Sequence, residues 1–306
     1  MTASTNVLVA LNNIFKRNST RLTPIFRSNG SANTAGDSLE YFVKDMFCTG
    51  ASQYQYDHEK EQVYKEYLSW TGDSSHFPDF IVRGGVGVEP KKMDNKSTAS
   101  LSLNSSYPKD YIEPTTQNVP TEKTKGYSET GWHKKPIIYV AGNLNKEKGP
   151  NENKLFSLWM VYGNTMVANN DKYISLINEI RGAIKNNTDA TLVKSKELAR
   201  AKGIDNLKYT NLRVRGMYEL EHPAKVFDKY IKDITLPEDK AHIFVVMLVS
   251  EYEKIKENMG DNWNQLNKEL QEFIDKGVLT RKKIEIDNPN DTSDKLDAYI
   301  FAGYTD

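Results

Sequence analysis

Two acidic residues and one lysine, Asp79, Glu89 and Lys91, have the types and the spacing that metal-dependent cleavage of a phosphodiester requires. Asp79 follows Pro78, and Glu89 stands two residues before Lys91 in the run Glu89-Pro90-Lys91. Carboxylates are ligands that Mg²⁺ prefers, and an ammonium beside the ion can orient or polarise an attacking water. The pattern therefore indicates phosphate-ester hydrolysis, with Asp79 and Glu89 as the metal ligands.

The segment between the two acids predicts a β-hairpin that brings these groups together. Strand-type residues at 80–82 and 86–88 flank a turn that contains two glycines. Because side chains alternate along a strand, a three-residue loop over 84–86 places Asp79 opposite Lys91, and all three functional groups then share one face. A two-residue loop would turn Asp79 to the other face, so the interpretation requires an odd loop.

Pro90 stands between the acid and the lysine, where it removes a backbone donor from the sheet. Proline in a strand is confined to edges and bulges, so either is expected here, and its carbonyl stays available as a metal ligand. Short patterns of this kind also occur by chance. The spacing alone thus leaves an ordinary hairpin open as the alternative.

A helix over residues 36–47 is predicted by the helical spacing of its apolar residues. Glu40 lies beside this apolar stripe, in the first turn. A first-turn acid is favoured by the helix dipole, so Glu40 is either an ordinary helix acid or a third carboxylate of the active site.

The remaining pattern predicts an α/β fold. We expect strands in several segments and helices in others, joined by a long loop over 110–135. The predicted strands are 99–109, 137–141, 155–162, 212–217, 280–287 and 298–301; the predicted helices are 7–15, 171–184, where we expect a helix that packs on the body, and 265–274. Residues 243–249 are apolar, and periodicity leaves both strand and helix open.

Two arginines, Arg213 and Arg215, share one face of the predicted strand 212–217. Arginines at this spacing can grip phosphates or guanine edges, whereas solvated or salt-bridged arginines are the commoner case.

Composition sets the outer limits. The 306 residues can bury the core of one domain, 1–306, with 240–306 as a candidate C-terminal subdomain. Lys and Arg number 41, as do Asp and Glu, so any contact with nucleic acid must come from a local patch. The lone cysteine, Cys48, excludes an intrachain disulfide. The apolar runs are too short to span a membrane, and we expect a cytoplasmic protein.

Six segments together resemble the NgoPII-like type II restriction endonucleases of the PD-(D/E)XK superfamily. They are residues 36–45, Pro78-Asp79, 89–92, 103–109, 212–217 and 286–290. Pro90 departs from the β-branched residue expected between the acid and the lysine. The resemblance implies a central mixed β-sheet flanked by helices.

The resemblance also implies an activity: a homodimeric, Mg²⁺-dependent endonuclease that cuts both strands of double-stranded DNA at a short palindrome, typically GGCC, with a cognate DNA methyltransferase as functional partner. Asp79 and Glu89 would bind the metal, Lys91 would be the water-orienting base, and Glu40 would complete the catalytic set. The candidate DNA contacts are Asn104, Ser105, Ser106, Lys109, Arg213 and Arg215.

Two other functions stay open from the sequence. One is a DNA-binding protein that has kept the fold and lost cleavage. The other is a nuclease of the same superfamily that acts on DNA ends, flaps or mismatches in repair.

Overall fold

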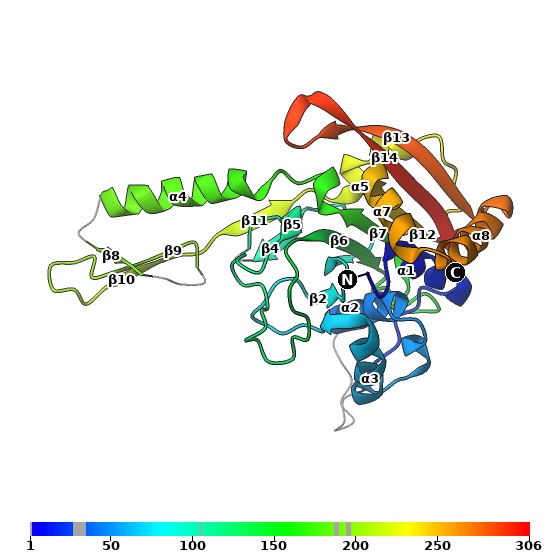
Figure 1. The fold of residues 1–306 in the computed structure, drawn as a ribbon, viewed down its shortest axis with the longest axis horizontal. Helices are drawn as coiled ribbons and strands as arrows, with labels where there is room; N and C mark the ends of the chain where they lie inside the picture. The colour runs from blue at the N-terminus through cyan, green and yellow to red at the C-terminus, as the bar shows by residue number, and fades with distance from the viewer. Residues whose placement is uncertain (1, 27–34, 105, 187–189, 194–196) are drawn as a thin grey trace.

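The computed structural model describes residues 2–26, 35–104, 106–186, 190–193 and 197–306. Within these residues the chain builds a nine-stranded mixed sheet (Figure 1). Along the sheet the strands are β1 (Leu68–Trp70), β2 (Phe80–Val82), β3 (Gly87–Asp94), β6 (Lys135–Leu144), β7 (Leu155–Tyr162), β12 (Ala241–Leu248), β14 (Asp291–Thr305) and β13 (Leu279–Asn288), with β5 (Tyr111–Ile112) paired to β6.

This sheet is mixed, with two parallel pairs among its neighbouring strands. β3 pairs with β6 in parallel and β7 with β12 in parallel, whereas the other neighbours are antiparallel. The apolar segment 243–249, for which the sequence leaves strand and helix open, forms most of β12. The candidate subdomain 240–306 contributes β12, β13 and β14 to the same sheet.

Both faces of the sheet are buried, because alternate residues of the central strands point to opposite sides. In β6, Ile138 and Val140 belong to one apolar cluster, and Ile137 and Tyr139 belong to the other. Five helices supply side chains to the first cluster: α1 (Val7–Arg17), α2 (Ala35–Phe47), α3 (Asp57–Tyr67), α7 (Val249–Met259) and α8 (Asn262–Asp275).

The second face is covered by shorter elements. Two short helices and a two-stranded ribbon contribute to its apolar cluster: α5 (Pro223–Val226), α6 (Asp228–Ile231), β4 (Leu101–Asn104) and β11 (Met217–Leu220). Two single-turn 3₁₀ helices, Ala51–Gln53 and Gly163–Thr165, complete the body. No helix in the described part of the chain is long and apolar enough to cross a bilayer.

One part of the chain leaves the body (Figure 1). α4 (Asn170–Asn186) and a three-stranded sheet of β8 (Thr191–Leu192), β9 (Ala199–Lys202) and β10 (Asn211–Val214) extend outward together. The helix predicted over 171–184 therefore forms, but the expectation that it packs on the body is wrong along most of its length. The expectation rested on four apolar residues at helical spacing, of which Ile174 is 40% exposed and Tyr173, Ile177 and Ile180 are only half-buried.

Candidate active site

The β2–β3 hairpin has the predicted odd loop, displaced by one residue. Phe80 pairs with Val88 and Ile81 with Gly87. The Val82 amide donates to the Val86 carbonyl at 2.8 Å, so the loop is 83–85 and not 84–86. Asp79 consequently lies across from Glu89, which corrects the predicted pairing with Lys91; because the shift is by two positions on the partner strand, the shared face is unchanged.

Gly84 explains why the loop sits there. Its φ is +66°, and a Cβ on this residue would lie 2.4 Å from the carbonyl oxygen of Thr2. Only glycine accepts both the left-handed backbone and this close approach of the N-terminal segment. The glycine therefore has to stand at the centre of the loop.

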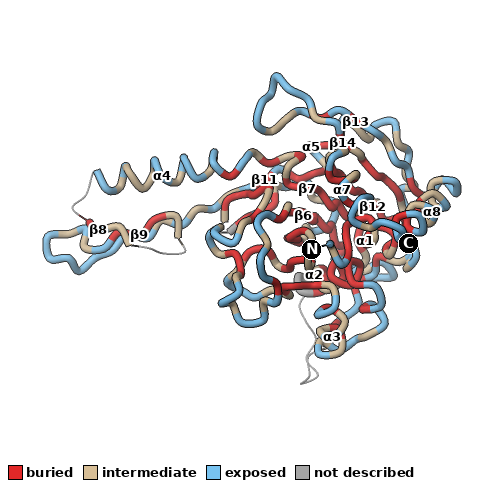
Figure 2. The backbone as a smooth tube through the Cα atoms, in the orientation of Figure 1, coloured by how far each residue is buried: buried red, intermediate tan, exposed pale blue. Residues whose placement is uncertain are grey.

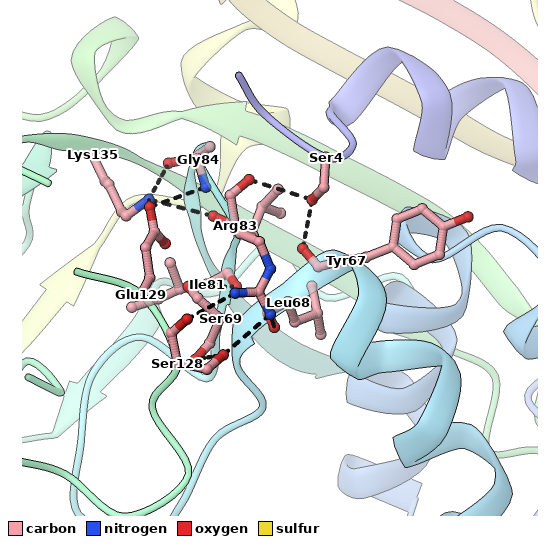
Figure 3. A network of polar contacts seen from close by, with 12 residues as sticks. Ser4, Tyr67, Leu68, Ser69, Ile81, Arg83, Gly84, Ser128, Glu129 and Lys135 are labelled. Atoms are coloured by element: carbon pink, nitrogen blue, oxygen red, sulfur yellow. Dashed lines mark hydrogen bonds and ion pairs between the residues drawn. The ribbon is translucent and has the colours of Figure 1, made fainter. Parts of the chain in front are cut away.

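Buried charges hold the hairpin loop in place (Figure 3). Lys135 Nζ lies 2.9 Å from Glu129 Oε1, and both side chains are almost fully buried. The same Glu129 oxygen accepts from the Gly84 amide at 3.1 Å, and Lys135 also donates to the carbonyls of Val82 and Gly85. Arg83 Nη1 and Nη2 bond the Ser128, Lys65 and Leu68 carbonyls and the Ser128 hydroxyl. These contacts fix the loop and, through it, the register that aligns the acids.

Pro90 costs the sheet no hydrogen bond on the β2 side. The carbonyl of Val86 faces β2, and backbone groups alternate in direction, so the nitrogen of Pro90 also faces that side. β2 is antiparallel to β3, and its first residue, Phe80, pairs with Val88. No residue of β2 therefore lies opposite Pro90. Of the edge and the bulge that the proline allows, the structure has a local edge on the β2 side, whereas β3 pairs with β6 along its whole length on the other side.

Asp79, Glu89 and Lys91 form one connected group. Lys91 Nζ donates to Glu89 Oε1 at 2.6 Å, and the Asp79 amide donates to Glu89 Oε2 at 3.0 Å. The Glu89 side chain is 9% exposed and that of Lys91 is 28% exposed. The hairpin therefore presents two carboxylates and an ammonium in a partly covered position.

Burial and like charge change the protonation of this group. Burial, and then the neighbouring Glu89 carboxylate, raise the pKa of Asp79 from 3.8 to about 8. Burial alone would lower the pKa of Lys91, but Glu89 and Asp79 outweigh it and raise that pKa above its usual value. Two carboxylates that repel each other across a hairpin are a place where a cation is favoured.

Glu40 approaches the same group from α2. Burial and the hairpin residues have the larger effects on the pKa of Asp79. After them, Glu40 raises this pKa and Lys44 lowers it, so both α2 side chains are close enough to act on Asp79. Lys44 Nζ donates to Glu40 Oε1 at 2.6 Å and to the Thr71 carbonyl at 2.6 Å, and its side chain is 5% exposed. Lys44 thereby ties the helix acid to the chain that leads into Asp79.

Gly72 marks how closely these segments meet. Its φ is +99°, and a Cβ there would lie 2.3 Å from the Asp79 carbonyl oxygen and 3.5 Å from Glu40 Oε1. Sequence reasoning missed both Gly72 and Lys44. The i, i+4 spacing of Glu40 and Lys44 is a signal that points to the lysine.

The donor set fits a hard divalent cation. Mg²⁺ commonly takes one or two carboxylates and fills its remaining positions with waters and substrate phosphate oxygens. Among the described residues no three His, Cys, Asp or Glu side chains are grouped so as to hold a metal without such help. Asp79 and Glu89 can supply the two carboxylates, and the Pro90 carbonyl, between Glu89 and Lys91 in the chain, is a further oxygen donor.

A cavity of about 510 Å³ opens at this site. Glu89 and Lys91 line it from β3, and Ser106, Arg213 and Arg215 line it from segments predicted to contact DNA. Arg213 and Arg215 both pair with Glu197 Oε1, at 2.6 and 3.3 Å, and still remain 56% and 64% exposed. The structure therefore brings the arginine pair to the same cavity as Glu89 and Lys91.

The other candidate contacts are placed differently. Lys109 is only 1% exposed; its ammonium donates to Ser106 Oγ and to the Tyr107 carbonyl and lies over the rings of Phe77 and Tyr107. Burial lowers the pKa of Lys109 to about 7, although Glu89 acts to raise it. Asn104 ends β4, and Ser105 lies outside the described residues.

The mixed sheet flanked by helices, with an acid pair and a lysine on one hairpin, is consistent with the restriction-endonuclease-like class of fold. The chain belongs to the NgoPII restriction endonuclease family, whose model matches residues 5–279. It is 34% identical over 266 residues to the type II restriction enzyme NgoPII of Neisseria gonorrhoeae, covering 86% of this chain and 87% of that one. No solved structure matches the chain. The protein is thus a type II restriction endonuclease, a site-specific deoxyribonuclease.

Proposed function

We propose that this endonuclease cuts both strands of duplex DNA at a short palindromic site in a reaction that depends on Mg²⁺. The observation that carries the proposal is the contact of Asp79 with Glu89 across the hairpin, where the Asp79 amide donates to Glu89 Oε2 at 3.0 Å and Lys91 Nζ lies 2.6 Å from Glu89 Oε1. Asp79 and Glu89 are the metal ligands, and Glu40 is the third acid of the site. A bound Mg²⁺ would supply a more acidic water and would offset the charge that builds on the phosphate.

Lys91 orients the attacking water in this proposal. Its pKa is raised by Glu89 and Asp79, so the group is an ammonium and acts on the water and the phosphate as a hydrogen-bond donor. The water oxygen would attack phosphorus and give its proton to surrounding water, while the bond from phosphorus to the sugar oxygen breaks on the opposite side and that oxygen takes a proton from a second water. Lys91 would hold the water on the line of attack. The resemblance implied a water-orienting base, and of that role we propose the orienting part, because a protonated amine cannot accept the proton of the water.

The DNA enters through the cavity that Glu89 and Lys91 line. Ser106, Arg213 and Arg215 line this cavity and are the contacts we propose there. Asn104, at the end of β4, and Lys109, which donates to Ser106 Oγ, are proposed beside them. Ser105 is proposed on the resemblance alone. Exposed guanidinium groups can bond phosphates or guanine edges. We propose GGCC as the target, the site implied by the family resemblance.

Cutting both strands of a palindrome calls for two active sites related by a twofold axis, so we propose a homodimer. A cognate methyltransferase would protect the host's own sites, and the pair would act in the cytoplasm. Within each protomer we propose that residues 1–306 form one endonuclease domain, with 240–306 as a candidate subdomain.

Incubation with unmethylated plasmid tests the proposal. With Mg²⁺ we expect discrete fragments, which disappear when EDTA is added, and sequencing of the fragment ends should return one short palindrome. Retarded but intact plasmid in Mg²⁺ would instead support a protein that binds DNA without cutting it. Cleavage confined to ends, flaps or mismatches would support a repair nuclease.

A further inference from the structure

The part of the chain that leaves the body is an arm, which comprises the described residues 170–186, 190–193 and 197–217. It consists of α4 and the sheet β10-β9-β8, which contact each other, and Arg181 Nε donates to the Leu198 carbonyl at 2.7 Å. Little of the arm is covered (Figure 2), and the residues buried beyond its base are alanines: Ala190, Ala199 and Ala201. The arm is therefore a two-layer extension with most of its side chains in solvent.

The arm is basic although the whole chain is neutral. Its described residues include eight Lys or Arg and four Asp or Glu, which gives a net charge of +4, against 41 and 41 in the complete sequence. Glu197 is neutralised by Arg213 and Arg215, and Asp205 accepts hydrogen bonds from its own loop. The positive charge is thus concentrated on one protruding element, which favours a polyanionic partner.

The base of the arm reaches the catalytic cavity. Arg213 and Arg215 line the same cavity as Glu89 and Lys91. A duplex whose backbone lies at the hairpin acids therefore meets the base of the arm first. The arm then continues outward from that point (Figure 1).

We propose that the arm binds the phosphate backbone of duplex DNA that flanks the cleavage position. This inference rests on the proposed entry of DNA through that cavity. The 17 residues of α4 span about 25 Å at a rise of about 1.5 Å per residue. At about 3.4 Å per base pair, the arm reaches about seven base pairs from the cut.

The arm tip is the loop over residues 203–210 between β9 and β10. In the proposal its side chains can contact only DNA that flanks the cleavage position. Lys202 and Lys208 stand at the two sides of the tip loop, both are exposed, and within the described residues neither has an ion-pair partner. Ile204, Leu207 and Tyr209 are exposed on the same loop, at 43%, 70% and 81%. A second copy of the arm would bring like charges together at this surface, whereas DNA matches the charge.

The salt dependence of DNA binding tests the inference. The measurement is the slope of log K against log [NaCl] for a 30-base-pair duplex in EDTA, for the wild-type protein and for the double variant Lys202→Ala, Lys208→Ala. Two lost phosphate contacts should reduce the magnitude of the slope by about 2 and weaken binding. The matched control is Lys268→Ala, Lys276→Ala, exposed lysines at α8, which lies at the opposite end of the molecule from the arm, and its slope should equal that of the wild type (Figure 1).

Unchanged slope and affinity in the Lys202→Ala, Lys208→Ala variant would overturn the inference. A fall in molecular mass by sedimentation in the variant Leu207→Ser, Tyr209→Ser would also overturn it, because it would show that the tip holds a second copy. The two proposals separate cleanly. If the Lys202→Ala, Lys208→Ala variant shows the predicted slope change but the wild-type protein never cuts plasmid, the inference about the arm stands and the proposed function fails. If the wild-type protein cuts plasmid but the variant shows no slope change, the proposed function stands and the inference about the arm fails.

Discussion

At the active site, three carboxylates face two ammonium groups, and each lysine is already paired with one acid. Lys91 bonds Glu89 and Lys44 bonds Glu40, which leaves Asp79 as the acid without a lysine of its own among these contacts. Burial, and then repulsion by Glu89, raise the pKa of Asp79, and Lys91 and Lys44 offset only part of this rise. The site is thus most strained electrostatically at the position where we place the metal.

Lys91→Ala should abolish most cutting and leave binding largely intact. The variant loses the group that orients the water, and we expect the cleavage rate to fall by about 10²- to 10⁴-fold. Plasmid cleavage in Mg²⁺ and duplex binding in EDTA are the two measurements. Cleavage at the wild-type rate would refute the role assigned to Lys91.

Lys44→Met should slow cleavage, because Glu40 loses the buried ammonium that holds its carboxylate against Thr71. Partners that orient metal-site carboxylates typically contribute about 10- to 100-fold to activity or metal affinity. The rate is measured as a function of Mg²⁺ concentration, on protein whose folding is verified by circular dichroism. Lys44→Arg keeps the cation and should recover part of the loss; equal rates in Lys44→Met and wild type would show that Lys44 does not position Glu40.

Asp79→Asn should stabilise the metal-free protein, increasingly as the pH rises. The pKa of Asp79 is about 8 in the folded protein and 3.8 ordinarily, so between these values the folded state binds the extra proton and stability falls with rising pH. The variant lacks this loss. In EDTA its advantage in unfolding midpoint should grow by about 2 °C or more between pH 5 and pH 8. A constant difference across that range would mean that the pKa of Asp79 is not shifted.

At the level of the elements, the hairpin shows what sequence can and cannot predict. The two glycines and the strand-type residues predicted a hairpin with an odd loop, and this is confirmed. The position of the loop depends on Thr2 and on the Glu129–Lys135 pair, which are distant in sequence from residues 83–85. The turn residues therefore predicted correctly which face Asp79 shares, but not which residue lies opposite it on β3.

Glu129→Ala should destabilise the protein strongly. It leaves the buried Lys135 ammonium without its carboxylate and removes the acceptor of the Gly84 amide. Breaking one side of a buried ion pair costs about 3–5 kcal/mol. Urea denaturation measures the loss, and Asp94→Ala, which breaks the exposed pairs with Lys92 and Lys146, should cost far less. Similar losses in the two variants would show that the buried pair does not hold the loop.

Across the whole molecule, sequence patterns identified the body better than the arm. The apolar runs over 137–141 and 155–162 predicted the central strands β6 and β7, which are buried on both faces. Apolar residues at helical spacing over 171–184 predicted a helix that packs, yet α4 projects from the body. Periodicity reports an apolar face but cannot say what covers it.

The sequence also could not predict where single residues lie in the fold when their neighbours come from distant parts of the chain. Lys109 was expected at a DNA surface and is buried beside Tyr107, because the fold closes aromatic rings around it. Arg213 and Glu89 are far apart in the chain and meet only because the arm returns to the body beside β4. The resemblance over six segments supplied the family, whereas the cavity required the structure.

A crystal soaked in MnCl₂ tests the central claim most directly, because anomalous scattering locates manganese without reference to activity. We predict one strong peak held by the carboxylates of Asp79 and Glu89, with Lys91 adjacent to it. A peak elsewhere, or no peak at this position in crystals of protein that cuts DNA in manganese, would contradict the account.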